Sequence, residues 1–295
     1  MANWGYIYCS SEWGDESNKN SIPIEQFNQC SAGCFEGASF LFTSKAALQT
    51  AVDLWVSDEA SAICTYGQIN TWNTSQITNM FALFRDKTTF NSNISNWDVS
   101  NVTTMNTMFR ECNAFNQNIG GWNTGNVEDM RYMFYGAEAF NQPIGTWNVS
   151  KVTNMFRMFD SAILFNQNIN AWNVSSVTDM RFMFYQTSVF NQDISSWNVS
   201  GVTYMGNMFY NAYAFNQDLS SWDVSNVTDM ERIFNATSLS TTNYDAILNG
   251  WSALTVQPNV PFGTGTIPYT AAAATAHNTL TSAPNSWIIT DGGQV

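Results

Sequence analysis

The chain has 295 residues, of which 44% are hydrophobic and only 11% are charged, and its net charge is −13. So acidic a chain has no basic surface for nucleic acid, and it has no run of 18 apolar residues that would cross a bilayer. Its length would suit two ordinary globular domains, but a repeat array can be longer than one such domain because it extends by stacking further repeats. We therefore expect no nucleic acid partner and no membrane insertion.

Residues 1–66 are predicted to form an N-terminal cap that contains cysteines. Residues 1–36 are rich in Gly, Ser, Asn and Cys and predict irregular structure, whereas 38–43 resembles a short strand. Ser44 suits the N-cap of a helix over 45–55. The residues that share one face of this helix are Leu48, Val52 and Trp55. Together these elements would close the open end of a repeat array.

The five cysteines are Cys9, Cys30, Cys34, Cys64 and Cys112. The four that precede the repeats predict one or two disulfide bonds of open pairing, with buried thiols as the alternative. The only histidine, His277, lies far from them in sequence, so we expect no metal site and no cofactor. Cys112 takes a repeat position that holds alanine in other copies, which predicts a small core residue.

A 25-residue repeat runs without insertion or deletion over 67–240. Tryptophan recurs at Trp72, Trp97, Trp122, Trp147, Trp172, Trp197 and Trp222, and methionine recurs at Met80, Met105, Met130, Met155, Met180, Met205 and Met230. A fixed period of this size is typical of a solenoid, in which each unit buries its apolar edge only against its neighbours.

Each repeat predicts two elements. Trp-x-Val with a polar middle residue, as at 97–99, indicates a short strand. Ser100 then stands where a helix N-cap is needed, and the apolar residues of 102–109 follow helical spacing. The fold class expected is an α/β repeat solenoid with a parallel sheet on one face, short helices on the other and a cap at each end.

An asparagine follows the phenylalanine of each copy, at Asn91, Asn116, Asn141, Asn166, Asn191 and Asn216. Such an asparagine can bond to turn backbone and to the asparagine stacked on it. The alternative is a ligand-binding ladder of amides. We favour the structural role because the residue is fixed beside a core phenylalanine.

Residues 241–295 break the period and predict a C-terminal α/β cap. A helix is expected over 243–251, ending near Gly250, followed by an alanine-rich helix within 269–280 and a strand over 287–290.

The repeat Phe-Asn-Gln-Asp-Ile-Ser-Ser-Trp-Asn-Val-Ser-x-Val-Thr-x-Met-x-x-Met-Phe, at 190–209, resembles the BspA-like leucine-rich-repeat surface proteins. It is more similar still to their 25-residue branch, a domain of unknown function in mycoplasma lipoproteins. The resemblance covers 67–240, and the tail over 243–293 is similar to segments that close such arrays. It implies a leucine-rich-repeat-like right-handed coil, surface display and adhesion to host matrix, with no catalytic residues. The chain departs from the family in lacking a visible signal peptide, lipobox cysteine or sorting tail.

Variation between copies points to a candidate binding site. On the predicted helix, the positions of Thr107 and Arg110 face outward, away from the Met/Phe stripe. Exposed aromatic and arginine side chains on a rigid array are what a partner surface uses, although scattered surface aromatics in a chain that is 15% aromatic are the alternative. The candidate binding residues are Tyr132, Tyr135, Arg157, Phe182, Tyr185 and Tyr210.

The sequence offers little for catalysis. One histidine gives no Ser-His-Asp or Cys-His apparatus, and no phosphate-binding loop is present. Asp129, Asp179 and Asp229 recur at one repeat position and are expected on a solvated helix face, so a polysaccharide-acting enzyme is a distant alternative. Asn-x-Ser/Thr sequences arise from the repeat itself and are poor evidence for glycosylation.

The predicted function is a non-enzymatic binding or adhesion protein that presents a rigid scaffold to a host-surface protein or glycan. The alternative is a structural virion component, such as a decoration, fibre-tip or tail-associated protein that contacts neighbouring virion or self subunits. The absence of a visible signal peptide favours the alternative, because virion proteins reach the outside by lysis. Either function places the chain outside the cell or on a particle surface.

Overall fold

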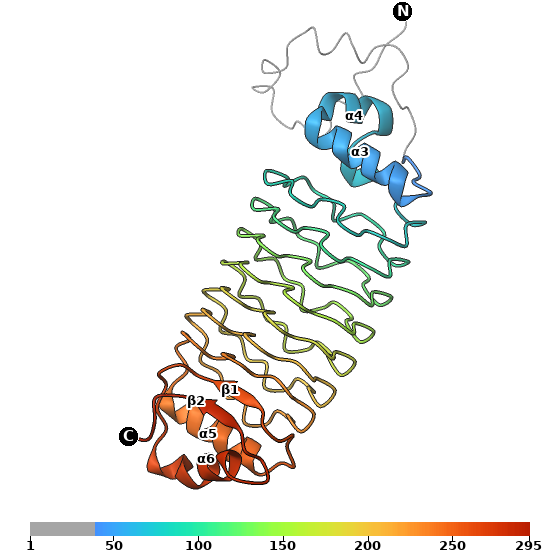
Figure 1. The fold of residues 1–295 in the computed structure, drawn as a ribbon. Helices are drawn as coiled ribbons and strands as arrows, with labels where there is room; N and C mark the ends of the chain where they lie inside the picture. Colours follow the sequence, from blue (N-terminus) through green and yellow to red (C-terminus); the bar gives the residue numbers. More distant parts are fainter. Residues whose placement is uncertain (1–38) are drawn as a thin grey trace, which may run out of the picture.

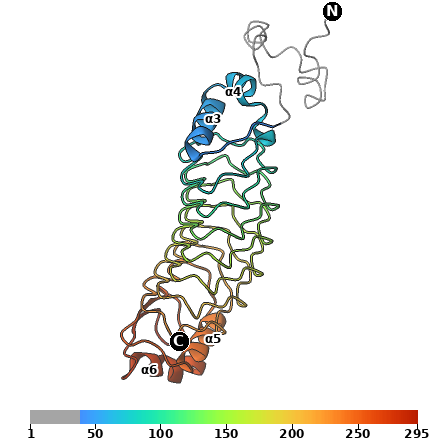
Figure 2. The same ribbon diagram turned by 90° about the vertical axis from the view of Figure 1, so that its right-hand side faces the viewer.

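A computed structural model of the chain describes residues 39–295. The helices and strands are α3 (Lys45–Ser57), α4 (Glu59–Tyr66), η2 (Ile69–Thr71), α5 (Thr241–Ser252), β1 (Pro261–Gly263), η3 (Ala271–Ala273), α6 (Ala274–Thr281) and β2 (Ile288–Thr290). Figure 1 shows α3 and α4 at one end of a stack of similar coils, and α5, α6, β1 and β2 at the other. The stack is elongated in both views (Figures 1 and 2).

The predicted helix over 45–55 is confirmed as α3. The Ser44 side chain caps it by accepting a hydrogen bond from the backbone N–H of Ala47 at 3.2 Å. Its buried side consists of Leu48, Ala51, Val52 and Trp55. Trp55 Nε1 donates to Ser92 Oγ in the first coil at 2.9 Å, so the helix covers the end of the stack.

The segment before α3 is less regular than predicted. The strand expected over 38–43 forms only one parallel bridge, between Leu41 and Asn73, and residues 1–36 lie outside the described part of the chain. Phe42 is nevertheless fully buried, and its ring lies 5.1 Å from that of Trp72. The segment therefore joins the core of the first coil without forming a regular strand.

The repeats contain neither of the elements predicted for them. Over 72–240 the backbone forms turns and isolated parallel bridges, with no helix and no extended strand. The helix expected within 102–109 and the strand expected over 97–99 are therefore wrong. Ser100 is also not a helix N-cap, since its backbone N–H donates to Asp98 Oδ1 at 2.9 Å and closes a tight turn.

The coils are joined by a row of backbone hydrogen bonds along residues 79–86 and their equivalents every 25 residues, here called the ladder segments. In the first of them, alternate amides donate to carbonyls of the next coil at 2.8–3.0 Å. The donor–acceptor pairs are Met80–Thr104, Ala82–Asn106, Phe84–Met108 and Asp86–Arg110. An amide donated to the next coil is not available for the carbonyl four residues back, so no α-helix can form here.

The amides between them close successive turns within the coil, such as Leu83 N–H to Met80 C=O at 3.3 Å. In the turns closed by Leu83 and Lys87 the third residue, Ala82 or Asp86, has positive φ, as in type II turns. In the ladder segments the residues with positive φ are Ala82, Asp86, Thr107, Glu111, Tyr132, Gly136, Arg157, Ser161, Phe182, Gln186, Asn207, Asn211, Arg232 and Ala236. Only one of them is glycine, the residue that most favours positive φ, so these turns are difficult to predict from the sequence.

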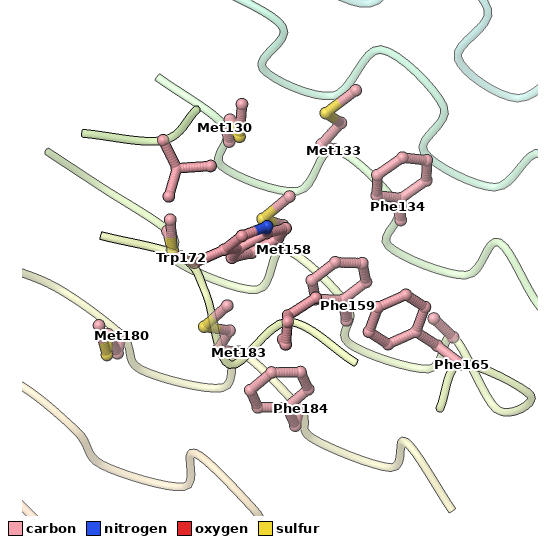
Figure 3. Close-up of a cluster of buried hydrophobic side chains, with 14 of the residues drawn as sticks. Met130, Met133, Phe134, Met158, Phe159, Phe165, Trp172, Met180, Met183 and Phe184 are labelled. Atoms are coloured by element: carbon pink, nitrogen blue, oxygen red, sulfur yellow. The ribbon is translucent and has the colours of Figure 1, made fainter. Parts of the chain in front are cut away.

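The core lies inside the coils and consists of columns of identical side chains (Figure 3). Phe134 stacks on Phe109 and on Phe159, each with ring centroids 5.6 Å apart and interplanar angles of 7° and 4°. Trp122 and Trp147 stack at 6.4 Å. A buried indole needs a partner for its N–H. Each repeat tryptophan from Trp97 onward finds one in the adjacent coil, as where Trp172 donates to the Ile144 carbonyl at 3.0 Å.

The asparagine column has the structural role expected of it. Asn166 Oδ1 accepts from the backbone N–H of Asn191 and from Gln192 Nε2, both at 3.0 Å in the next coil. The same arrangement recurs from Asn91 onward along the stack. The column ends on α5, where Asn243 Nδ2 donates to Asn216 Oδ1 at 2.9 Å.

The C-terminal segment continues the interior of the coils. The predicted helix over 243–251 is confirmed as α5, and its Trp251 donates from Nε1 to the Leu219 carbonyl at 3.1 Å, as the repeat tryptophans do. Met230 bridges Phe262 of β1, which pairs in parallel with β2. The row of parallel pairing therefore passes from the last coil into β1 and β2.

Two cysteines lie within the described residues. Cys64 is disulfide-bonded. Cys112 is a free thiol with no exposed surface, as predicted, and burial raises its pKa to about 12. Its Sγ donates to the Phe84 carbonyl at 2.9 Å. The predicted disulfides of Cys9, Cys30 and Cys34 fall outside the described part of the chain.

The sign of a glycine substitution separates this backbone from a helix. Ala236 is exposed and has a φ of +57°. We expect Ala236→Gly to raise the free energy of unfolding by about 1 kcal/mol, because glycine removes the left-handed strain. In a helix the same change would lower it by about 1 kcal/mol.

Urea denaturation followed by tryptophan fluorescence would measure the change. Ala114→Gly is the matched control, since Ala114 is exposed and its φ is not positive, and it should lower stability slightly. A destabilised Ala236→Gly variant would contradict the turn structure of the ladder segments.

Candidate functional site

The ladder segments divide their side chains between the core and one outer surface. In 129–136, the side chains of Met130, Met133 and Phe134 are fully buried, whereas those of Tyr132 and Tyr135 are half-buried at the surface. Because equivalent residues of successive coils are hydrogen-bonded to one another, each outward position forms a column along the stack. We call the surface made by these columns the arginine–aromatic face.

All six arginines of the chain lie in these columns, at Arg85, Arg110, Arg131, Arg157, Arg181 and Arg232. The aromatic residues of the face are Phe81, Tyr132, Tyr135, Phe156, Phe182, Tyr185, Tyr204 and Tyr210. In a chain with a net charge of −13, this is a strong segregation of arginine to one surface.

The structure brings the six candidate binding residues onto this face in two groups. Tyr132 and Tyr135 lie together, with ring centroids 6.0 Å apart. The second group is Arg157, Phe182, Tyr185 and Tyr210. In it the guanidinium of Arg157 lies 4.0 Å from the ring centroid of Phe182. Tyr185 lies 5.6 Å from the Phe182 ring and stacks on Tyr210 at 5.2 Å.

Three further residues join these groups and were missed by the sequence reasoning. Phe156 bridges them, since its ring lies 5.2 Å from that of Tyr132 and 5.8 Å from that of Phe182. Arg181 lies over the rings of Phe156 and Tyr204, at 5.3 Å and 4.9 Å. Phe156 and Arg181 each follow the first methionine of their repeat, a position that a helix would not place beside the candidate residues. The variation of residue type at this position between copies was the signal in the sequence that could have found them.

Two outward placements were wrong. Thr107 is only 7% exposed, and its hydroxyl donates to the Asn106 carbonyl at 2.7 Å. Asp160, the equivalent of Arg110, is 1% exposed. Both stand in the columns of Tyr132 and Tyr135, whose longer side chains reach the surface. The shorter side chains of Thr107 and Asp160 instead bond to the Asn106 carbonyl and to Arg157.

We had expected the recurring aspartates on a solvated helix face, and this prediction was wrong. Asp129 Oδ1 accepts from the backbone N–H and Nε of Arg131, and its Oδ2 accepts from Nη2 of the same residue at 2.8 Å. Asp179 binds Arg181 in the same way. Burial raises the pKa of Asp129, but the hydrogen bonds from Arg131 and Asn106 outweigh it and hold the pKa below its usual value. These carboxylates orient arginines.

Asp160 is the most buried charge of the face. Its Oδ2 accepts from Arg157 Nη1 at 2.5 Å, and its Oδ1 accepts from the Ser161 hydroxyl at 2.8 Å. Burial raises the pKa of Asp160 to about 6, although both bonds lower it. The bonds therefore offset only part of the cost of burying this carboxylate.

The described residues offer two hollows as candidate small-ligand sites and no candidate metal site. Two shallow hollows of about 350 and 360 Å³ lie at opposite ends of the stack, one around Trp72 and Asn73 and one between Arg232 and Ile288. Within 39–295, no group of three or more His, Cys, Asp or Glu residues is arranged to hold a metal ion. None of the described helices is both long and apolar enough to cross a bilayer.

The raised pKa of Asp160 predicts a pH dependence of stability. Between about pH 4 and 6, the folded chain holds a proton on Asp160 that the unfolded chain has released, since the ordinary value is 3.8. The free energy of unfolding should therefore fall as pH rises through this window and level off above it. Asp160→Asn should remove this component.

Urea unfolding of both chains at pH 4, 5, 6 and 7 would measure the difference. The comparison cancels the aspartates of lowered pKa, such as Asp129 and Asp223, which act in the opposite direction at lower pH. Equal pH slopes in wild type and variant would refute the assignment.

Comparison with known proteins identifies a family for this chain. No curated protein and no solved structure matches it significantly. The family model described as "Mycoplasma protein of unknown function, DUF285" matches residues 55–162 and 142–251, which together cover about two thirds of the chain. The two matches span the coils and extend into α3 and α5. The chain therefore belongs to this family of unknown function.

Proposed function

We propose that the chain is a non-enzymatic binding protein whose arginine–aromatic face contacts a protein partner. Its coils would form a solenoid scaffold of the BspA-like leucine-rich-repeat kind, displayed outside the cell. The single observation that carries the proposal is the gathering of all six arginines and eight aromatic residues on one surface of an acidic chain. Arginine and tyrosine are among the residues that contribute most to protein–protein binding energy.

The geometry of the face supports a protein partner more than a small ligand. The two best-defined hollows of the described residues lie at the ends of the stack. Arg131 and Arg181 are held by bidentate carboxylates, and Arg157 by Asp160 and the Phe182 ring. Side chains held in this way lose little conformational entropy on binding. A preorganised, open surface suits another protein of complementary shape.

The stack behind the face gives it stiffness. Four backbone hydrogen bonds per coil join neighbouring ladder segments, and the asparagine column adds side-chain bonds on another side of the coil. Adhesion to host matrix would use such a surface directly. The virion alternative would instead use it between neighbouring subunits, and that alternative stays a prediction.

Substitution of two tyrosines tests the proposal. Tyr135→Ala combined with Tyr185→Ala removes one ring from each group of the face. We expect the affinity for the partner to fall by roughly a hundredfold or more, because central tyrosines often contribute about 2 kcal/mol each. Both side chains are half-buried at the surface, so the unfolding midpoint should change little.

The measurement is binding of the intact chain to a panel of purified host extracellular proteins and glycans, followed by titration of each binder. Tyr213→Ala is the matched control, because Tyr213 is 56% exposed and lies outside the ladder segments. An unchanged affinity in the double variant, or an equal loss in the control, would remove the face as the contact surface.

A further inference from the structure

We propose that Arg110 is a recognition site for a carboxylate, supplied by an aspartate or glutamate side chain of the partner protein. This inference rests on the proposed function, since it names the chemistry that the partner must bring to the arginine–aromatic face. Arg110 differs from the other arginines of the face in its charge pairing and its hydrogen bonding, and it shares aromatic support with Arg157 and Arg181.

The first observation is the pairing of charges. Every other arginine has a carboxylate oxygen within 3.3 Å of a guanidinium nitrogen. The pairs are Arg85–Asp86, Arg131–Asp129, Arg157–Asp160, Arg181–Asp179 and Arg232–Glu231. Within the described residues, Arg110 has no ion pair. It is therefore the one arginine of the face whose charge the chain leaves unmatched.

The second observation is an unsatisfied donor. The Nε of Arg110 has almost no exposed surface and no hydrogen-bond partner in the described structure. A buried donor without an acceptor is costly, and more so when it belongs to a charged group. The residue as a whole is half-buried, so the rest of the side chain reaches the surface. A partner carboxylate would pair with the exposed part of the guanidinium, and a small rotation of the side chain would let it bond Nε as well.

The third observation is that the guanidinium is already held in place. It lies 5.1 Å from the ring centroid of Tyr135 and 6.0 Å from that of Tyr132. Contacts of this kind orient an arginine while leaving its hydrogen-bonding edge for another group. The aromatic support of the site is thus in place before the ligand arrives.

The carboxylates of Asp86 in the preceding coil and of Glu111 beside Arg110 in sequence do not fill the site. Asp86 is paired with Arg85. Glu111 follows Arg110 directly, but its carboxylate lies over Gly136, where a Cβ would come within 2.6 Å of Glu111 Oε2. The competing arrangement is a rotation of Glu111 toward Arg110, and the experiment must exclude it.

Arginine-selective NMR on the intact chain tests the site. With ¹⁵N-labelled arginine the chain gives only six Nε–H signals, each assigned by one Arg→Lys variant. The probe is the peptide acetyl-Ala-Glu-Ala-amide, and its glutamine counterpart is the matched control. We expect the glutamate peptide to shift the Arg110 signal while leaving the five paired arginines in place, and the glutamine peptide to shift none.

Several results would overturn the assignment. They are a uniform shift of all six signals, no shift of the Arg110 signal, or an equal response to sodium chloride at the same ionic strength. A methyl sialoside that acts at lower concentration than the peptide would move the site to an acidic sugar. A large displacement of the Arg110 signal in Glu111→Gln without any peptide would show that Glu111 already fills the site.

Partner binding separates this inference from the proposed function. Arg110→Gln should weaken the partner by about tenfold or more, because its carboxylate would be left without a counter-charge. If the tyrosine double variant loses the partner while Arg110→Gln keeps it, only the Arg110 site fails. If the peptide shifts Arg110 but the tyrosine double variant keeps its partner, the proposed face fails and the carboxylate site stands alone.

Discussion

The structure depends on the alternation of backbone amides along the ladder segments. One amide donates to the next coil and the following amide closes a turn within its own coil, as those of Ala82 and Leu83 do. This alternation fixes the register between coils, and in that register each side chain stacks on its equivalent in the next coil. The phenylalanine, tryptophan and asparagine columns follow from it, because each needs its equivalent in the adjacent coil. A single inserted residue would displace all of these columns together.

The 25-residue period, the apolar columns, the asparagine column and the elements at both ends could be predicted from the sequence. The path of the backbone through Met130–Phe134 could not. Buried residues at the first, fourth and fifth positions satisfy a helix, and a series of turns buries the same positions. Glycine or asparagine at most of the positive-φ positions of the ladder segments would have distinguished the two, but only Gly136, Asn207 and Asn211 are of these types, and residues such as Tyr132 and Phe182 occupy the others.

This ambiguity decided which parts of the candidate site were found. The candidates were chosen as positions that a helix exposes, and they do share a face, because turns and helix agree at those positions. They disagree at the residue after the first methionine, so Phe156 and Arg181 were missed. Thr107 and Asp160 stand at the same positions as the candidates but are buried, because their short side chains bond to the Asn106 carbonyl and to Arg157. Sequence periodicity therefore predicts a surface residue correctly only at positions that a helix and a series of turns both expose.

The positive-φ positions also bear on function. A non-glycine residue in the left-handed region costs about 1–2 kcal/mol, so stability alone favours glycine there, with asparagine or aspartate next. At the first such position, three consecutive coils instead hold Tyr132, Arg157 and Phe182, all with φ near +55° to +58°. None of the three is in the core, and all contact other residues of the face. Large side chains at a strained, non-core position cost stability without filling the core, which agrees with the recognition role proposed for the surface they form.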